Sequence, residues 1–112
     1  KDIFEHVFLN IISNSIDAIS HDNGYITVEF EKVYDDLQIR ISDNGHGIKE
    51  DCLDNIFNPF FTTKDPGEGT GLGLYVVYNE VQKSGGSIRV YSEYGEGTTF
   101  IINFPVNIKE RE

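Results

Sequence analysis

Sulfur-containing residues are scarce in this 112-residue chain, which has no methionine and a single cysteine, Cys52. One thiol excludes an internal disulfide, and a lone cysteine is typical of a reducing compartment, so we expect a cytoplasmic location. No run approaches the roughly 18 apolar residues that a membrane-spanning helix needs, and no signal peptide is visible. We therefore expect no direct membrane contact from this chain. Because it starts at Lys1, we also expect it to be a fragment or a processed product of a longer protein.

Basic residues are also few, since nine Lys and Arg stand against 19 Asp and Glu, for a net charge of −10. A nucleic-acid-binding protein presents a basic face, so no nucleic-acid partner is expected. The acidity favours solubility, but an anionic ligand would have to be attracted locally against the overall field. Hydrophobic content of 38% is ordinary for one globular domain, which we expect to span residues 1–112.

Hydrophobic periodicity predicts two long helices, over residues 2–20 and 72–84, and a short helix over 49–56. In the first helix a narrow polar strip holds His6, Asn10, Asn14, Asp17 and His21, and a broad apolar face holds Phe4, Val7, Phe8, Leu9, Ile11, Ile12, Ile16, Ala18 and Ile19. In the other helices the residues expected to face inward are Leu53, Ile56, Leu74, Tyr78 and Val81.

Four segments alternate apolar and polar residues as half-buried strands do. Their apolar positions are Ile26, Val28 and Phe30; Leu37, Ile39 and Ile41; Ile88 and Val90; and Phe100, Ile102 and Phe104. Turns are expected at 35–36 and 94–97. The sequence therefore predicts an α/β (α+β) two-layer sandwich, with helices packed on one face of a mixed, mostly antiparallel sheet.

The polar strip of the first helix contains two asparagines one turn apart, Asn10 and Asn14. Asparagine is a poor helix former, and solvated helix faces usually carry Glu, Lys or Arg instead. An amide oxygen is a hard ligand that suits Mg²⁺. A magnesium site and an ordinary polar helix surface both remain open on this evidence.

A carboxylate, Asp43, continues the inward-facing parity of the second strand and begins the segment Asp43-Asn44-Gly45-His46-Gly47-Ile48. A buried carboxylate without a partner is costly, so Asp43 either caps the following turn or accepts a hydrogen bond from a ligand. The exocyclic amine of adenine is one such donor. Gly45 and Gly47 would let the backbone approach something flat.

Glycines alternate in the segment 67–74, Gly-Glu-Gly-Thr-Gly-Leu-Gly-Leu, which leads into the second long helix. Free N–H groups beside the positive end of a helix dipole form a phosphate site. The segment is not a Walker A loop, because no Gly-Lys-Ser/Thr follows, and it is not a dinucleotide fingerprint, because no strand precedes it. A flexible linker is the alternative interpretation.

Residues 57–71 contain little helix or strand signal, and a loop this long in a compact domain is usually functional. The loop includes Asn58-Pro59-Phe60-Phe61-Thr62-Thr63-Lys64, and Lys64 is the only basic residue between Lys49 and Lys83. This cation could offset the overall negative field at a phosphate site. We expect residues 57–70 to form a lid that admits a nucleotide and closes over it.

In this order, the four motifs resemble the catalytic domain of sensor histidine kinases, which shares its Bergerat-type ATP-binding fold with gyrase, Hsp90 and MutL. The resemblance runs from Asp2 to Pro105. The segment Asn10–Asn14 looks like the N box of the family, DNGHGI its G1 box, NPFFTTK its F box and GTGLGL its G2 box, and GEGTTF resembles the last glycine-threonine element.

The resemblance implies a role for each matching position. Asn14 would bind Mg²⁺ with Asn10 in support, Asp43 would accept from the adenine amine, and Lys64 would contact the terminal phosphates of ATP. The remaining nucleotide contacts implied are Gly45, Gly47, Ile48, Gly69, Thr70, Gly71, Leu72, Gly73 and Thr98. The neighbouring Thr99 is the main ambiguity, although the parity of Thr98 matches that of Asp43.

The chain departs from many family members at Asp17 and Ala18, where a lysine and an aromatic residue are usual. With the TTK sequence, this resembles the subgroup that includes nitrogen-regulation kinases. Gyrase-like ATPases and anti-sigma serine kinases carry a glutamate at the position of Asn10, where it can act as a general base. A neutral amide there favours transfer to a histidine, while a pseudokinase that only binds partners remains a third alternative.

Phosphoryl transfer requires mainly positioning and charge neutralisation. His6, His21 and His46 do not lie on a plausible acceptor helix, so the phosphoacceptor histidine is expected upstream of Lys1. The resemblance thus implies two partners: the dimerisation and histidine-phosphotransfer domain of the same protein, and the receiver domain of a response regulator.

Overall fold

The computed structural model describes residues 2–19, 22–59 and 73–106. Within them the helices and strands follow one another as α1 (Asp2–Ala18), β1 (Ile26–Val33), β2 (Asp36–Asp43), the 3₁₀ helix η1 (Glu50–Asn55), α2 (Gly73–Lys83), β3 (Ser87–Glu93) and β4 (Gly97–Pro105). No helix in this described part is long and apolar enough to cross a membrane.

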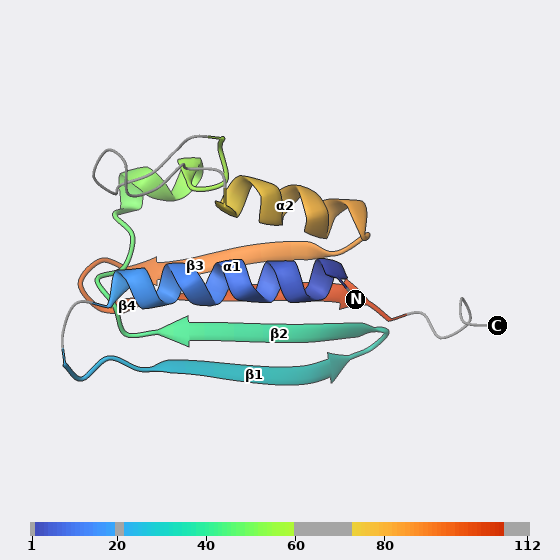
Figure 1. Cartoon of the computed structure of the whole chain (residues 1–112), viewed down its shortest axis with the longest axis horizontal. Helices are drawn as coiled ribbons and strands as arrows, with labels where there is room; N and C mark the ends of the chain where they lie inside the picture. The colour runs from blue at the N-terminus through green and yellow to red at the C-terminus, as the bar shows by residue number, and fades with distance from the viewer. Residues whose placement is uncertain (1, 20–21, 60–72, 107–112) are drawn as a thin grey trace.

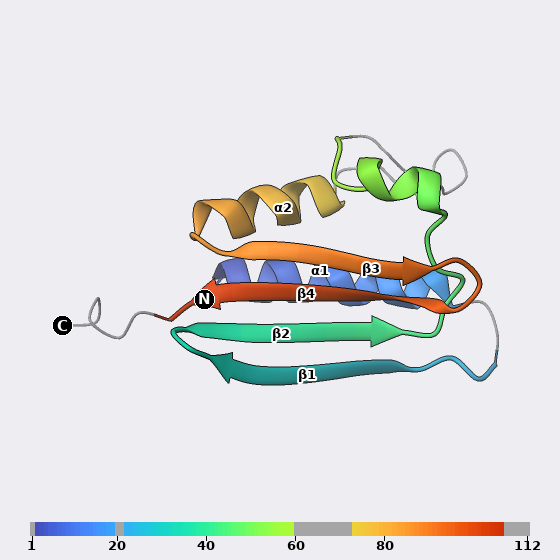
Figure 2. The same cartoon turned by 180° about the vertical axis from the view of Figure 1, so that it is seen from behind.

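The strands form one sheet in the order β1-β2-β4-β3, and each neighbouring pair is antiparallel. Helices α1 and α2 lie on the same face of this sheet, and the opposite face carries no described helix (Figures 1 and 2). In the register, Asp43 at the end of β2 stands opposite Thr98 at the start of β4. The two-layer fold expected from the sequence is confirmed, and the described pairings are antiparallel throughout.

The core lies between the helices and the sheet, where apolar residues at helical and strand spacing meet. Helix α1 contributes Val7 and Ile11, spaced one turn apart, and α2 contributes Val77 and Val81 in the same way. The sheet contributes the inward positions of its strands, namely Ile39, Ile41, Ile88, Phe100 and Ile102. Truncating a fully buried isoleucine to alanine costs about 2–5 kcal/mol, so this layer holds the site-forming elements together.

The apolar face of α1 is narrower than the sequence predicts, because Leu9 and Ile16 are each 58% exposed. At about 100° per residue, both lie on the side of the helix opposite Val7 and Ile11. The sheet-facing side instead includes Ser15, which is 1% exposed. The prediction that Leu9 and Ile16 belong to the core was therefore wrong.

Smaller differences concern the ends and faces of other elements. Helix α1 ends at Ala18, and the turn between β1 and β2 lies at residues 34–35, where Tyr34 has a positive φ of 57°. In α2 the buried residue beside Val81 is Val77, whereas Tyr78 is 37% exposed and packs in a tilted arrangement against Phe57, with ring centroids 5.3 Å apart.

Candidate functional site

Two residues of the polar strip of α1, His6 and Asn10, face α2. His6 Nδ1 lies 2.6 Å from Glu80 Oε1, near the end of α2. One turn further along α1, Asn10 Oδ1 lies 3.3 Å from the position that a Cβ on Gly73 would occupy, at the start of α2. The two helices therefore run in opposite directions (Figure 1). Asn14 is about 6 Å further along α1 than Asn10. It therefore lies toward the N-terminal end of α2, where the first N–H groups of that helix have no partner within it.

The two asparagines of this strip are held differently. Asn10 Nδ2 donates to the His6 carbonyl oxygen at 2.9 Å, which leaves Oδ1 directed at Gly73. Asn14 is half-buried, and its amide makes no hydrogen bond to another described residue. The described residues contain no group of three or more His, Cys, Asp or Glu side chains that could hold a metal. A single amide oxygen fits Mg²⁺, which takes few protein ligands and completes its shell with phosphates and water.

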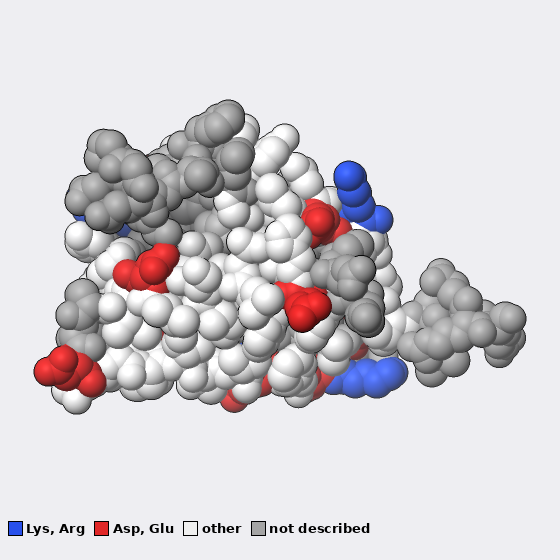
Figure 3. Space-filling model, in the orientation of Figure 1, with Lys and Arg blue, Asp and Glu red and all other residues white. Residues whose placement is uncertain are grey.

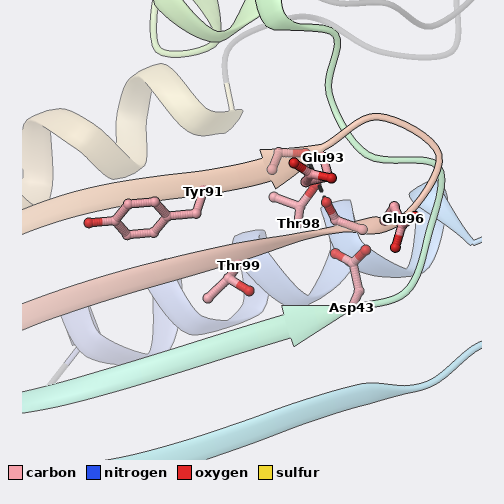
Figure 4. Close-up of a pocket in the computed structure, with 8 residues that line it drawn as sticks. Asp43, Tyr91, Glu93, Glu96, Thr98 and Thr99 are labelled. Carbon is pink, nitrogen blue, oxygen red and sulfur yellow. Dashed lines mark hydrogen bonds between the residues drawn. The ribbon is translucent and has the colours of Figure 1, made fainter.

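Asp43 ends β2 on the helix-facing side and is 8% exposed. Its Oδ1 accepts a hydrogen bond of 2.8 Å from the backbone N–H of Gly45. The predicted turn cap is thus confirmed for one oxygen, and no described residue hydrogen-bonds to the other. Asp43 also lines a hollow of about 280 Å³ at this end of the sheet (Figure 4). Both faces contribute to it: Ser92 and Thr98 belong to the helix-facing side, Tyr91, Glu93 and Thr99 belong to the uncovered side, and Glu96 and Gly97 belong to the β3–β4 hairpin.

The turn after Asp43 is wedged between two parts of the chain. A Cβ on Gly45 would lie 2.5 Å from the Ala18 carbonyl oxygen, and a Cβ on Gly47, whose φ is +77°, would lie closer still to the Glu93 carbonyl oxygen. His46 N–H donates to the same Ala18 carbonyl at 2.9 Å. The space left by these glycines, which the sequence analysis assigned to a flat ligand, is filled by the protein's own backbone.

The structure places the two threonines on opposite faces of the sheet, as strand parity predicts. Thr98 is 6% exposed and shares the helix-facing side with Asp43, its partner across the β2–β4 pair. Thr99 faces the uncovered side of the sheet, where its Oγ1 lies 3.0 Å from Ser42 Oγ. Of the two hydroxyls, that of Thr98 lies on the same side of the sheet as the carboxylate of Asp43.

Ser92 is a residue of this site that the sequence analysis missed. Its hydroxyl contacts the backbone N–H of Ile48 at 2.7 Å, the carbonyl of Gly97 at 2.9 Å and Thr98 Oγ1 at 3.0 Å. It therefore joins the turn after Asp43 to the β3–β4 hairpin. Strand parity could have placed it inward, since it continues the pattern of Ile88 and Val90.

Several predicted residues lie outside the described residues, namely Lys64, Gly69, Thr70, Gly71 and Leu72, and so does most of the lid expected over 57–70. Of the glycine-rich segment, Gly73 is described, at the start of α2. In the view that shows α1, the most prominent Lys and Arg side chains lie at the end of the molecule away from Asp43 (Figure 3). Lys49 is a cation near the site, with Nζ 5.5 Å from the centroid of the Tyr94 ring.

Comparison with known proteins gives a consistent result. The family model of histidine kinase-, DNA gyrase B-, and HSP90-like ATPases matches residues 1–108. The sensor histidine kinase ZraS of Escherichia coli K12 is 45% identical over 111 residues, which is 99% of this chain and 23% of that protein. This chain thus spans less than a quarter of the length of that curated relative.

Solved structures agree with the sequence match. The catalytic domain of histidine kinase ThkA superposes with a TM-score of 0.78 at 31% identity, over 93% of this chain and 66% of that one. Full-length ShkA in complex with AMPPNP superposes with a TM-score of 0.81 at 25% identity, over 92% of this chain and 21% of that one.

Proposed function

Because this chain belongs to the family of histidine kinase-, DNA gyrase B-, and HSP90-like ATPases, we propose that it binds Mg-ATP and transfers the γ-phosphate to a histidine on a separate domain in two-component signalling. The sensor histidine kinase that it resembles over 99% of its length supports this choice within the family. The nucleotide analogue in the ShkA structure supports a nucleotide as the ligand.

The observation that carries the proposal is the approach of Asn10 to Gly73, which brings the polar strip of α1 to the start of α2. The N-terminus of α2, with its free N–H groups and positive dipole end, favours anions such as phosphates. Asn14, one turn beyond Asn10, would supply an amide oxygen to Mg²⁺ at this junction. When bound, Mg²⁺ would neutralise phosphate charge during transfer. Lys64 and the backbone of Gly69, Thr70, Gly71, Leu72 and Gly73 are proposed as the remaining phosphate contacts.

The base of the nucleotide would lie at the end of β2. Asp43 presents a carboxylate oxygen that no described residue uses, and Thr98 lies opposite it in the β2–β4 pair. A carboxylate accepts hydrogen bonds, so it suits the 6-amino group of adenine. Ile48 and the Gly45–Gly47 turn shape this end of the site, and their fixed packing keeps Asp43 in place.

The position of Asn10 argues against water or a serine hydroxyl as the acceptor. Its amide donates to His6 and its oxygen faces Gly73, and a neutral amide cannot take a proton as a general base does. A histidine ring is itself a nucleophile and needs no such base. We propose that this acceptor belongs to a dimerisation domain of the same parent protein and that a response regulator receiver domain takes the phosphate onward.

Calorimetric titration of the chain with ATP, with and without Mg²⁺, tests the binding step. In Asn14→Ala the Mg²⁺-dependent part of ATP affinity should disappear, while the melting temperature stays unchanged or rises slightly, since alanine is the better helix former. Ser13→Ala, at the exposed neighbouring position of the same helix, is the matched control and should bind Mg-ATP normally. Normal Mg-ATP binding by Asn14→Ala would show that the metal assignment is wrong.

A further inference from the structure

The hydroxyl of Ser92 has three hydrogen-bonding neighbours, and each has a fixed chemical role. The N–H of Ile48 can only donate, so Ser92 Oγ accepts from it at 2.7 Å. The carbonyl of Gly97 can only accept, so Ser92 gives it its single proton at 2.9 Å. The third neighbour, Thr98 Oγ1 at 3.0 Å, could donate or accept by geometry alone.

Counting protons settles the direction of that third bond. A serine hydroxyl has one proton and two lone pairs. Since the proton of Ser92 goes to Gly97, Thr98 must donate its own proton to Ser92. The oxygen of Thr98 then has only lone pairs left for other partners. Thr98 and Asp43 are opposite one another in the β2–β4 register and are both buried on the helix-facing side, so both present acceptors on that side of the sheet.

We propose that Ser92 is a positioning residue that sets the nucleotide specificity of this site by holding Thr98 as a pure hydrogen-bond acceptor. This proposal rests on the proposed function. With Ser92 in place, Thr98 cannot turn its proton toward a ligand carbonyl. At a direct contact with the C6 substituent, the site therefore favours a purine with an amine at C6 over one with a carbonyl at C6.

The packing around Ser92 explains why a serine suits this position. The β3–β4 hairpin is joined to the turn after Asp43 by a second bond, in which Gly95 N–H donates to the His46 carbonyl at 2.6 Å. A Cβ on Gly97 would clash with the Asp43 carbonyl oxygen, so these backbones are in close contact. A rigid frame of backbone therefore fixes the orientation of the Ser92 hydroxyl, which accepts the proton of Thr98.

The same sheet supplies a matched control on its other face. Ser42 Oγ and Thr99 Oγ1 also lie 3.0 Å apart, one residue along β2 and β4 from Asp43 and Thr98. This pair is half-buried, as Ser92 is, but faces away from the helices. Loss of the Ser42 hydroxyl removes a comparable Ser–Thr contact without touching the proton of Thr98.

The test measures dissociation constants of Mg-ATP and Mg-ITP by calorimetry, since inosine has a carbonyl in place of the C6 amine of adenosine and an N–H in place of the N1 acceptor. The wild-type chain should prefer ATP. Ser92→Ala should reduce the ATP-over-ITP preference about five-fold, the usual weight of one hydrogen bond, and Ser42→Ala should leave it unchanged. Thr98→Val should reduce the preference similarly, and the Ser92→Ala/Thr98→Val double variant should match Thr98→Val, because Ser92 acts through Thr98.

Should Ser92→Ala fail to fold, Ser92→Cys keeps the side-chain shape with a much weaker hydrogen-bonding group and should show the same direction of change. An unchanged preference in a folded Ser92 variant, additive effects in the double variant, or an equal loss in Ser42→Ala would each overturn the inference. Wild-type binding of ATP and ITP with equal affinity would overturn it while leaving the kinase proposal standing. Wild-type binding of neither nucleotide would overturn both.

Discussion

Replacing Asp43 by asparagine should exchange a hydrogen-bond acceptor for a donor without disturbing the turn. Oδ1 of Asp43 accepts from Gly45 N–H at 2.8 Å, inside a buried turn. The asparagine oxygen can take over this bond, whereas the flipped amide would face Gly45 N–H with a donor. The turn therefore fixes the amide with its NH₂ group in place of the second carboxylate oxygen.

The size of the effect follows from the group that is left unpaired. An adenine amine facing the new NH₂ group has lost its acceptor, which costs about 1–3 kcal/mol or roughly five- to 150-fold in affinity. A C6 carbonyl would meet a donor instead, so the affinity for ITP should rise relative to ATP. Stability should change little, whereas Asp43→Ala leaves Gly45 N–H unpaired in a buried turn and should lower the free energy of unfolding by about 1–3 kcal/mol.

Calorimetry with Mg-ATP and Mg-ITP on the wild type and Asp43→Asn measures the preference between the two nucleotides. Thermal unfolding of the wild type, Asp43→Asn and Asp43→Ala measures how much the hydrogen bond in the turn contributes to stability. For a domain of this size, 1 kcal/mol corresponds to about 4–8 °C in melting temperature. The reasoning is refuted by an Asp43→Asn variant that binds ATP as tightly as the wild type and with the same preference over ITP.

Gly73→Ala places a Cβ 3.3 Å from Asn10 Oδ1, so Mg-ATP affinity should fall in a titration while thermal stability is kept or rises, since alanine favours helix; unaltered affinity would contradict the role of this contact. Ile11→Ala should lower the free energy of unfolding, measured in urea, by about 2–5 kcal/mol, whereas Leu9→Ala, at a position 58% exposed, should lower it by less than about 1 kcal/mol. Equal losses in the two variants would contradict the assigned faces of α1. GTP should bind at least about ten-fold more weakly than ATP, because its C6 carbonyl faces the Asp43 carboxylate, and equal binding in competition would refute that orientation.

Much of the fold could be predicted because the strands alternate in a simple way. Asp43 and Thr98 were placed inward by parity alone, and the β2–β4 register brings them opposite each other. The period of a strand is two, so each residue has one of only two directions. A local pattern is then enough to assign a side chain to the helix-facing layer.

Helical faces were harder to assign, because several residues fit the same wheel. In α2, Tyr78 and Val77 both fit helical spacing between Leu74 and Val81, and contact with the sheet selects Val77. In α1, Leu9 is apolar but lies away from the sheet. Such a choice depends on which side the neighbouring layer covers, and that information lies in other parts of the chain.

The network around Ser92 could not have been predicted from spacing. It joins a turn, a strand and a hairpin that are up to 44 residues apart in sequence, through hydrogen bonds of a single hydroxyl. The filled space beside Gly45 and Gly47 is a similar case, since only the folded chain shows that Ala18 and Glu93 occupy it. Local patterns identify a site's residue types, whereas their partners emerge from packing.

The central claim is that this chain transfers phosphate from ATP to a histidine of another domain. The direct test incubates it with γ-labelled Mg-ATP, alone and with the histidine-bearing helical domain of its parent protein, and then treats the products with acid. We expect negligible hydrolysis and no self-labelling by the chain alone, and an acid-labile label on the added domain. Acid-stable label, brisk ATP hydrolysis by the isolated chain, or tight ATP binding without transfer to that histidine domain would contradict the account.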